Sequence, residues 1–211
     1  MRITGGMLRG RRVEMPEGII RPAMDRMRES IFAALGDLSG LSFLDIFSGS
    51  GIIALEAASR GAGPVEAVEK DPRKRGTLIR NVSMSPVRIE CHFVAAELFV
   101  LRAKRRFDLI FCDPPFPYRY KWELLKNIAA SALVGPGSRL LLHRPREDSQ
   151  RALIEGGIPE RLVHTGAKTY GRSVVDFFTF VSSSASFDEA SPSGQMSPLL
   201  GSPPQPSGPL P

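Results

Sequence analysis

The chain contains few cysteines, histidines and tryptophans, and their scarcity excludes several classes of protein. It holds 2 Cys, 3 His and 1 Trp among 211 residues. Cys91 and Cys112 have no second Cys or His at zinc-ligand spacing, so the sequence predicts neither a disulfide framework nor a structural zinc site. His92, His143 and His164 are scattered along the chain. We expect each histidine to be structural or at the surface, without a metal or a triad partner.

Long apolar runs are also missing. The first 18 residues lack the apolar core of a signal peptide, and no stretch approaches the ~20 apolar residues that a bilayer-spanning helix needs. We therefore expect a cytoplasmic protein with no membrane partner. No segment carries an oligomerisation signal, so a monomer is expected.

Aliphatic periodicity fades after residue 181. Residues 182–211 are dominated by Ser, Pro and Gly, and such a composition cannot bury enough apolar surface to offset the entropy of ordering the chain. The sequence therefore predicts three parts. They are a basic β-hairpin extension over 1–20, one α/β domain over 21–181 and a disordered tail over 182–211.

Positive charge is concentrated near the N-terminus. The formal net charge is +6, and residues 1–28 hold seven arginines against three acidic residues. A basic face of this kind favours a polyanionic partner, because binding releases the counterions of the polyanion. A lopsided but merely solvated basic surface is the alternative interpretation.

Short apolar strands alternate with helical segments beyond residue 40, which indicates a mostly parallel sheet covered on both faces. A first helix is predicted from Asp25, as N-cap, to Gly36, as C-cap. The predicted strands are 42–47, 65–69, 88–95, 107–112, 138–143, 161–165 and 174–181, and the last two form an antiparallel hairpin. The predicted helices between the strands are 52–60, 72–84, 97–104, 122–133 and 147–155.

The first strand of the sheet ends in a glycine turn that indicates a cofactor site. Gly49 and Gly51 let the backbone approach a ligand closely, and Glu69 ends the second strand, where its carboxylate can accept ribose hydroxyls. The glycine spacing alone also satisfies the loose dinucleotide fingerprint. Asp45 favours S-adenosylmethionine over a nicotinamide dinucleotide, because a carboxylate suits the methionine ammonium and opposes a pyrophosphate.

The residues Asp113-Pro114-Pro115-Phe116 follow the fourth strand and are suited to holding a planar amino group. A base amine could donate one hydrogen to Asp113 and another to the carbonyl of Pro114, while Phe116 stacks on the ring. The prolines fix φ near about −65° and thereby the direction of the carbonyls. A Pro-Pro loop after a core strand is the plain structural alternative.

Several separated motifs make the chain resemble the RsmD-type methyltransferases, which modify the exocyclic N2 of a guanine in 16S ribosomal RNA. The motifs are RITGGMLRGRRV (2–13), RPAMDRMRESIF (21–32), DIFSGSG (45–51), VEKD (68–71), DPPF (113–116) and KTYGRS (168–173). The resemblance implies a class I, Rossmann-like methyltransferase fold with a seven-stranded sheet. It also implies S-adenosylmethionine as cofactor without a metal, and ribosomal RNA or the small subunit as partner.

The resemblance also assigns roles to residues. Asp113, Pro114 and Phe116 would position the base. Asp45, Phe47, Gly49, Gly51 and Glu69 would hold the cofactor. Arg9, Arg11, Arg12, Arg21 and Arg26 would contact RNA. Ala95 stands where members of this fold often place an adenine-binding Asp or Asn, so the backbone around Ala96 would take that role.

Other functions remain open at this point. The DPPF motif would serve equally for adenine N6 in DNA or RNA, or for a glutamine amide in a protein. A non-catalytic RNA-binding protein could keep the same fold. A nicotinamide oxidoreductase fits the glycine turn but has no use for the DPPF loop.

Overall fold

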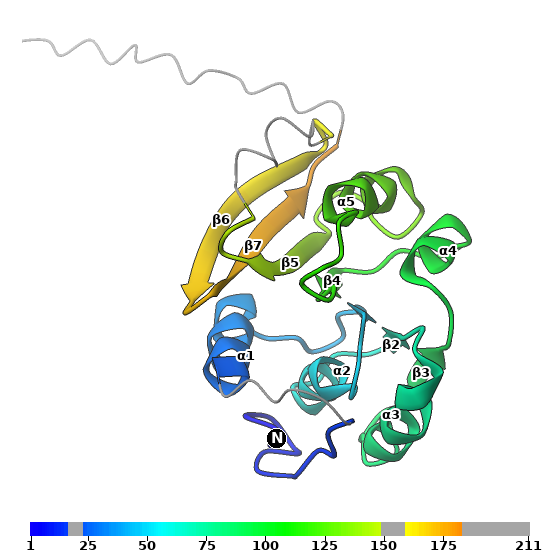
Figure 1. Ribbon diagram of the computed structural model, residues 1–211, viewed down its shortest axis with the longest axis vertical. Helices are drawn as coiled ribbons and strands as arrows, with labels where there is room; N and C mark the ends of the chain where they lie inside the picture. The colour runs from blue at the N-terminus through cyan, green and yellow to red at the C-terminus, as the bar shows by residue number, and fades with distance from the viewer. Residues whose placement is uncertain (17–22, 149–158, 183–211) are drawn as a thin grey trace, which may run out of the picture.

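The computed structural model describes residues 1–16, 23–148 and 159–182, and seven strands in these segments form one sheet (Figure 1). The strands are β1 Phe43–Ile46, β2 Val65–Val68, β3 Ile89–His92, β4 Leu109–Cys112, β5 Arg139–Pro145, β6 Leu162–Tyr170 and β7 Ser173–Phe180. Their order is β3-β2-β1-β4-β5-β7-β6. The first five are parallel, β7 is antiparallel to β5, and β6 is antiparallel to β7.

The strand order reverses between β1 and β4, and this reversal positions the site. β2 and β3 continue the sheet on one side of the pair, and β5 continues it on the other. Open α/β sheets bind ligands beyond the carboxyl ends of the strands at such a switch point.

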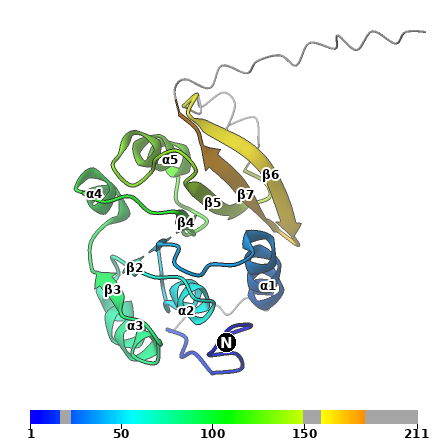
Figure 2. The ribbon, with the colours of Figure 1, turned by 180° about the vertical axis from the view of Figure 1, so that it is seen from behind.

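Helices cover both faces of the sheet (Figures 1 and 2). They are α1 Ala23–Leu35, α2 Ile52–Ser59, α3 Arg75–Val82, α4 Ala96–Leu101 and α5 Lys121–Ala130, with a 3-10 turn at Pro72–Lys74 before α3. One apolar cluster joins α1 and α2 to the sheet, and a second joins α4 and α5 to its other face. Successive side chains of a strand point to opposite faces, so Phe43 of β1 enters the first cluster and Leu44 the second.

All seven predicted strands are present, but some boundaries and roles were wrong. Asp25 is not the N-cap, because α1 begins at Ala23 and the Asp25 carboxylate accepts a hydrogen bond from Arg28 within the helix. Gly36 ends α1 with φ 76°, as predicted. Asp71 caps Pro72–Lys74 as a 3-10 turn, and the α-helix proper starts only afterwards.

The C-terminal hairpin is longer than predicted. β6 extends to Tyr170 with a register shift between His164 and Gly166, and the turn begins only at Gly171. The helix predicted over 147–155 falls mostly outside the described residues, and its first two residues lie in a turn. The tail from 183 onward is also outside them.

The N-terminal segment forms a compact loop with little regular strand. A single antiparallel bridge pairs Arg2 with Arg12, so the predicted β-hairpin is reduced to one bridge and a few backbone hydrogen bonds. Ile3, Leu8 and Val13 are buried in the α1–α2 cluster. This apolar anchor holds the loop against the domain and leaves its arginines exposed. Whether residues 1–20 form a part separate from 21–181 stays a prediction.

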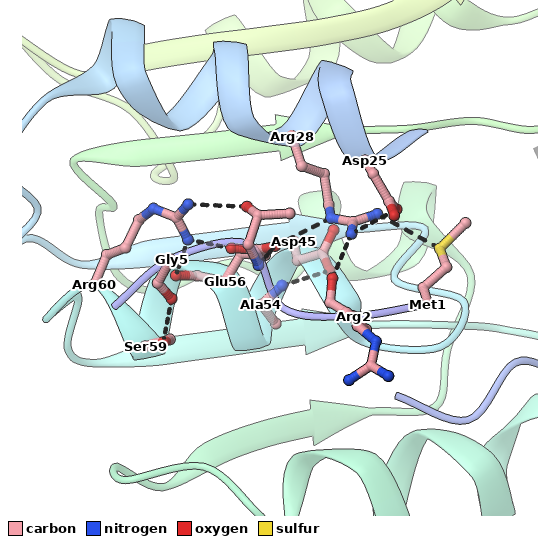
Figure 3. A network of polar contacts seen from close by, with 11 residues as sticks. Met1, Arg2, Gly5, Asp25, Arg28, Asp45, Ala54, Glu56, Ser59 and Arg60 are labelled. Carbon is pink, nitrogen blue, oxygen red and sulfur yellow. Dashed lines mark hydrogen bonds and ion pairs between the residues drawn. The ribbon is translucent and has the colours of Figure 1, made fainter. Parts of the chain in front are cut away.

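The carboxylate of Glu56 on α2 binds the N-terminal loop to the domain (Figure 3). It accepts hydrogen bonds from the backbone N–H of Thr4 (2.7 Å) and from Arg28 Nε (3.2 Å), and it forms an ion pair with Arg60. Arg28 is completely buried and also donates to the carbonyl of Arg2 (2.7 Å). One carboxylate thus connects α1, α2 and the loop.

None of the helices in the described segments is long and apolar enough to cross a lipid bilayer.

Replacing Glu56 tests this connection. Glu56→Ala leaves the guanidinium of Arg28 buried with only the half-exposed Asp25 as counter-charge, and breaking a buried ion pair costs about 3–5 kcal/mol. Urea unfolding followed by circular dichroism should show a loss of that size. Glu29→Ala is the matched control, because Glu29 is exposed on α1, and it should change the free energy of unfolding by less than about 0.5 kcal/mol. Equal losses in the two variants would contradict the role of Glu56.

Candidate active site

A cavity of about 500 Å³ opens where the first, second, fourth and fifth strands end. Its volume lies within the range of small-molecule sites. The lining residues are Met1, Met15, Pro16, Asp45, Phe47, Ser48, Gly49, Ser50, Ile52, Ile53, Glu69, Lys70, Asp71, Lys74, Asp113, Pro114, Pro115, Phe116 and His143. The cavity therefore joins the glycine turn, the DPPF loop and both ends of the N-terminal loop at the switch point of the sheet.

The glycine turn adopts backbone conformations that other residues rarely take. Gly49 and Gly51 have φ values of 57° and 79°, and a Cβ added to Gly51 would lie 2.5 Å from Leu78 Cδ1. Phe47 shares the left-handed region with φ 67°, which is uncommon for a residue with a Cβ. Its ring packs edge-on against Tyr118, 5.4 Å between centroids.

Glu69 closes the turn from the neighbouring strand. Its carboxylate is 5 % exposed and accepts hydrogen bonds from the backbone N–H groups of Gly49 and Asp71, each at 2.8 Å. Lys74 Nζ lies 3.5 Å from its Oε2. A carboxylate has about four acceptor positions, so Glu69 keeps capacity for a further donor such as a ribose hydroxyl. The side chain is thereby fixed at the cavity wall in the place the sequence predicts.

Asp45 is a buried carboxyl group in an unfavourable electrostatic environment. It is 1 % exposed and accepts a hydrogen bond from the N–H of Ala54, at 3.2 Å (Figure 3). Burial, and next the charge of Asp113, raise the pKa of Asp45 to about 8, and Glu69 adds to the shift. A cationic ligand would favour the ionised form, whereas a pyrophosphate would add repulsion. The cavity accordingly fits a ligand with a sulfonium and an ammonium group better than a dinucleotide.

Asp113 is held by an unexpected partner. Its backbone N–H donates to the carbonyl of Ile46 (3.1 Å), which joins the DPPF loop to β1. Its Oδ1 lies 2.7 Å from Nδ1 of His143, and the ring of Phe116 packs edge-on against the same imidazole at 5.6 Å. The expectation that His143 has no triad-type partner was wrong. Both residues lie at the carboxyl ends of adjacent parallel strands. Knowing that β4 and β5 are neighbours in the sheet would have been enough to predict this pair.

The other two histidines also have carboxylate partners, in keeping with the structural role expected of them. His92 Nε2 lies 2.8 Å from Glu66, and His164 Nε2 lies 3.1 Å from Asp176. Glu66, Glu90 and His92 are close enough to hold a metal ion. Arg105 already pairs with Glu66 at 3.0 Å, and the group lies outside the cavity lining.

The segment after DPPF is held by polar contacts to neighbouring helices. Lys121 is 5 % exposed and donates to the carbonyls of Phe116 (3.0 Å) and Tyr118 (2.7 Å). The hydroxyl of Tyr118 donates to Glu97 at 2.5 Å, and burial together with this carboxylate raises the pKa of the phenol. The loop that carries Phe116 is therefore tied to α4 as well as to α5.

The structure brings most of the predicted site residues together. Asp45, Phe47, Gly49, Glu69, Asp113, Pro114 and Phe116 line the cavity, and Gly51 caps α2 directly behind it. Ala96 begins α4 and is not among the lining residues, so its contact with an adenine stays a prediction. Arg9, Arg11, Arg12 and Arg26 are exposed, and Arg21 lies outside the described residues.

Sequence reasoning missed the contribution of the N-terminal loop to the cavity. Met1, Met15 and Pro16 form part of its wall. The backbone of the loop folds back on itself through the hydrogen bond from Val13 N to Met1 O (2.9 Å). The basic loop and the cavity are therefore parts of one surface.

Lys168 and Tyr170 lie in β6 and contact α1 rather than the cavity. The hydroxyl of Tyr170 donates to Ser30 Oγ at 2.8 Å, and Lys168 Nζ lies 3.5 Å from the same oxygen. The KTYGRS motif therefore has a structural role in positioning α1 against the hairpin.

Proteins of similar sequence belong to the family that the motifs resemble, and proteins of similar structure have the same fold. Residues 1–179 match the family model described as Conserved hypothetical protein 95. The "Ribosomal RNA small subunit methyltransferase D" of Escherichia coli K12 is 34 % identical over 119 residues, which cover 55 % of this chain and 60 % of the relative. The alignment thus spans less than two thirds of that relative. Its name confirms the resemblance to the RsmD-type family.

Two solved structures show the same fold. A hypothetical protein of Thermus thermophilus superposes with a TM-score of 0.70 and 30 % identity, covering 84 % of this chain and 98 % of that one. TrmN from Thermus thermophilus superposes with a TM-score of 0.62 and 24 % identity, covering 74 % and 48 %. The predicted class I methyltransferase fold, mostly parallel with a C-terminal antiparallel hairpin, is confirmed.

The raised pKa of Asp45 predicts that a cationic ligand, such as the S-adenosylmethionine expected from the sequence, would bind more tightly as the pH rises from 6 to 8. Below its pKa of about 8 the carboxyl of Asp45 is mostly protonated. A cationic ligand favours the carboxylate form, so binding requires release of this proton. Each unit of pH should therefore raise the affinity by up to about tenfold. Titration calorimetry at pH 6, 7 and 8 measures this dependence, and buffers of different ionisation enthalpy should reveal proton release on binding.

Two variants check that Asp45 is the group responsible. Asp45→Asn should abolish the pH dependence. It should also raise the free energy of unfolding above that of the wild type at pH 8, because the stability contributed by the neutral carboxyl is lost as pH rises towards 8. Asp71→Asn should lower affinity equally at all three pH values, because Arg73 holds the pKa of Asp71 at about 2. A wild-type affinity that stays constant with pH would contradict this account.

Proposed function

This chain belongs to the family described as Conserved hypothetical protein 95, and we propose that it methylates the exocyclic N2 of a guanine in 16S ribosomal RNA, using S-adenosylmethionine. The observation that carries the proposal is one cavity at the switch point that contains the acidic cofactor residues and the DPPF loop. The printed name of the Escherichia coli relative supports small-subunit ribosomal RNA as substrate. The guanine N2 target rests on the family resemblance.

The cofactor would be held by the residues of the glycine turn and its acidic neighbours. Asp45 would bind the methionine ammonium, and Glu69 would bind the ribose hydroxyls. The open backbone at Gly49 and the ring of Phe47 complete this side of the cavity. When bound, S-adenosylmethionine supplies a methyl group on a sulfonium whose C–S bond breaks as the acceptor nitrogen forms its bond to carbon.

Asp113 and its neighbours would prepare the acceptor nitrogen. The lone pair of a guanine amine is delocalised into the ring, so hydrogen bonds to Asp113 and to the Pro114 carbonyl would favour the pyramidal form. Phe116 would stack on the base and offset part of the cost of removing it from its helix. Holding the amine in a near-attack geometry is the largest expected contribution, on the order of 7–11 kcal/mol.

Asp113 would also take the proton that the methylated nitrogen sheds. Its side chain is 26 % exposed, so the proton can pass from the carboxyl to solvent. Oδ1 is the oxygen bound to His143, which leaves Oδ2 for the amine.

The exposed arginines of the N-terminal loop would bind the RNA backbone. Arg9, Arg11 and Arg12 are exposed while Ile3 and Leu8 anchor the loop in the core. Because Met1 and Met15 of the same loop line the cavity, phosphates bound there would lie beside the base to be modified. Methylation of adenine N6 is the second candidate, since DPPF suits either amine.

Replacing Asp113 tests the catalytic assignment. Asp113→Ala should lower methyl transfer to 16S ribosomal RNA by at least about 100-fold and leave the affinity for S-adenosylmethionine nearly unchanged. Tritium transfer and titration calorimetry measure the two quantities, and mass spectrometry of the RNA identifies the modified base. Asp37→Ala, at an exposed carboxylate after α1, is the control. Turnover retained by Asp113→Ala would rule out this role, and N6-methyladenine in the product would favour the second candidate.

Replacing two loop arginines tests the RNA surface. Arg11→Gln with Arg12→Gln should weaken RNA binding and reduce the slope of log K against log salt by about 1.4, or about 0.7 for each lost phosphate contact to a single strand. Fluorescence anisotropy across a salt series measures this slope. Arg102→Gln with Lys104→Gln removes the same charge from an exposed site after α4 and should leave the slope nearly unchanged. Equal slopes in both double variants would contradict a role for the loop.

A further inference from the structure

His143 is almost completely buried at the end of β5, yet it reaches the cavity. It is 2 % exposed and belongs to the cavity lining. Nδ1 lies 2.7 Å from Asp113 Oδ1. Nε2 is buried and has no hydrogen-bond partner among the described residues.

These contacts indicate which ring nitrogen of His143 carries a proton. Nδ1 must carry a proton, because the carboxylate oxygen of Asp113 can only accept. If Nε2 were also protonated, the ring would carry a positive charge and bury an unsatisfied charged N–H. Burying an unpaired lone pair costs much less than burying an unpaired charged donor. The contacts therefore favour a neutral ring with its single proton on Nδ1.

A neutral donor orients Asp113 without cancelling its charge. The hydrogen bond engages Oδ1 and restricts rotation of the carboxylate, so that Oδ2 keeps one direction. The edge-on contact with Phe116 at 5.6 Å joins the same ring to the aromatic group beside Asp113. His143 thus contacts both side chains that would hold the base.

We propose that His143 is a positioning residue for the methyl transfer, in which its neutral Nδ1–H aims the Asp113 carboxylate at the substrate amine and its ring supports Phe116. This inference rests on the proposed function. It assigns His143 no contact with the reacting atoms. The pair resembles in principle the way a carboxylate and an imidazole fix one another's orientation in other active sites.

Two substitutions separate positioning from packing. His143→Leu removes the donor and keeps an apolar side chain, so kcat should fall about 10- to 100-fold, the effect of losing one hydrogen bond to a charged group. KM for the RNA and the affinity for S-adenosylmethionine should change less than about threefold. His143→Asn can place an amide N–H near the position of Nδ1, and its kcat should recover to within about threefold of the wild type. Thermal unfolding of each variant verifies that the fold is kept.

A structural measurement tests the same bond without turnover. The chain has only 3 His, so long-range ¹⁵N–¹H NMR spectra of the rings can be assigned by the loss of one set of signals in His143→Asn. The His143 ring should carry its proton on Nδ1 and none on Nε2. A proton at Nε2, or a doubly protonated ring, would overturn the proposal.

The outcomes test the proposed methyl transfer and the positioning role of His143 separately. Absence of methyl transfer to 16S ribosomal RNA by the wild type refutes the proposed function and the positioning role built on it. With wild-type turnover established, a His143→Leu variant with unchanged kcat would sink the positioning role alone. A loss of kcat in His143→Asn as large as in His143→Leu would also count against it, because a positioning role requires the donor and not the ring.

Discussion

The buried carboxylate of Glu56 is the interaction on which the rest of this molecule depends. It lies on α2, the helix that starts at the glycine turn, and it binds Arg28 of α1, Arg60 and the backbone of the N-terminal loop. The same helix offers the N–H of Ala54 to Asp45. One short helix therefore contacts Asp45 at its first turn and the basic loop further along. It links the cavity to the loop that carries the exposed arginines.

Two of the carboxyl groups that line the cavity, Asp45 and Asp113, have different surroundings. Asp45 is buried with a backbone donor and near another acid, and these surroundings raise its pKa. Asp113 is partly exposed and has an imidazole donor, so it suits an acceptor role towards an amine. Environment rather than residue type gives the two acids different chemical character. This difference suits the separate cofactor and substrate roles proposed for them.

A recurrent feature of the sheet is that each histidine pairs with a carboxylate of a neighbouring strand. His92 pairs with Glu66 across β3 and β2, and His164 with Asp176 across β6 and β7. His143 of β5 pairs with Asp113, which directly follows β4. The partners are 26, 30 and 12 residues apart in the chain. No local sequence pattern links residues that are so far apart in the chain. Strand order alone brings these groups within hydrogen-bond distance.

The sequence by itself determined the strand and helix pattern, the glycine turn and the DPPF loop, because these features depend on local periodicity and on backbone conformations that only certain residues allow. Glycines 49 and 51 and the acids at 45, 69 and 113 could be identified before any contact was known. Only the tertiary structure decided that His143 holds Asp113, that Arg28 is buried against Glu56, and that Met1 reaches the cavity. These contacts join residues far apart in the chain, and their formation depends on strand order and helix packing, which no short stretch of sequence encodes.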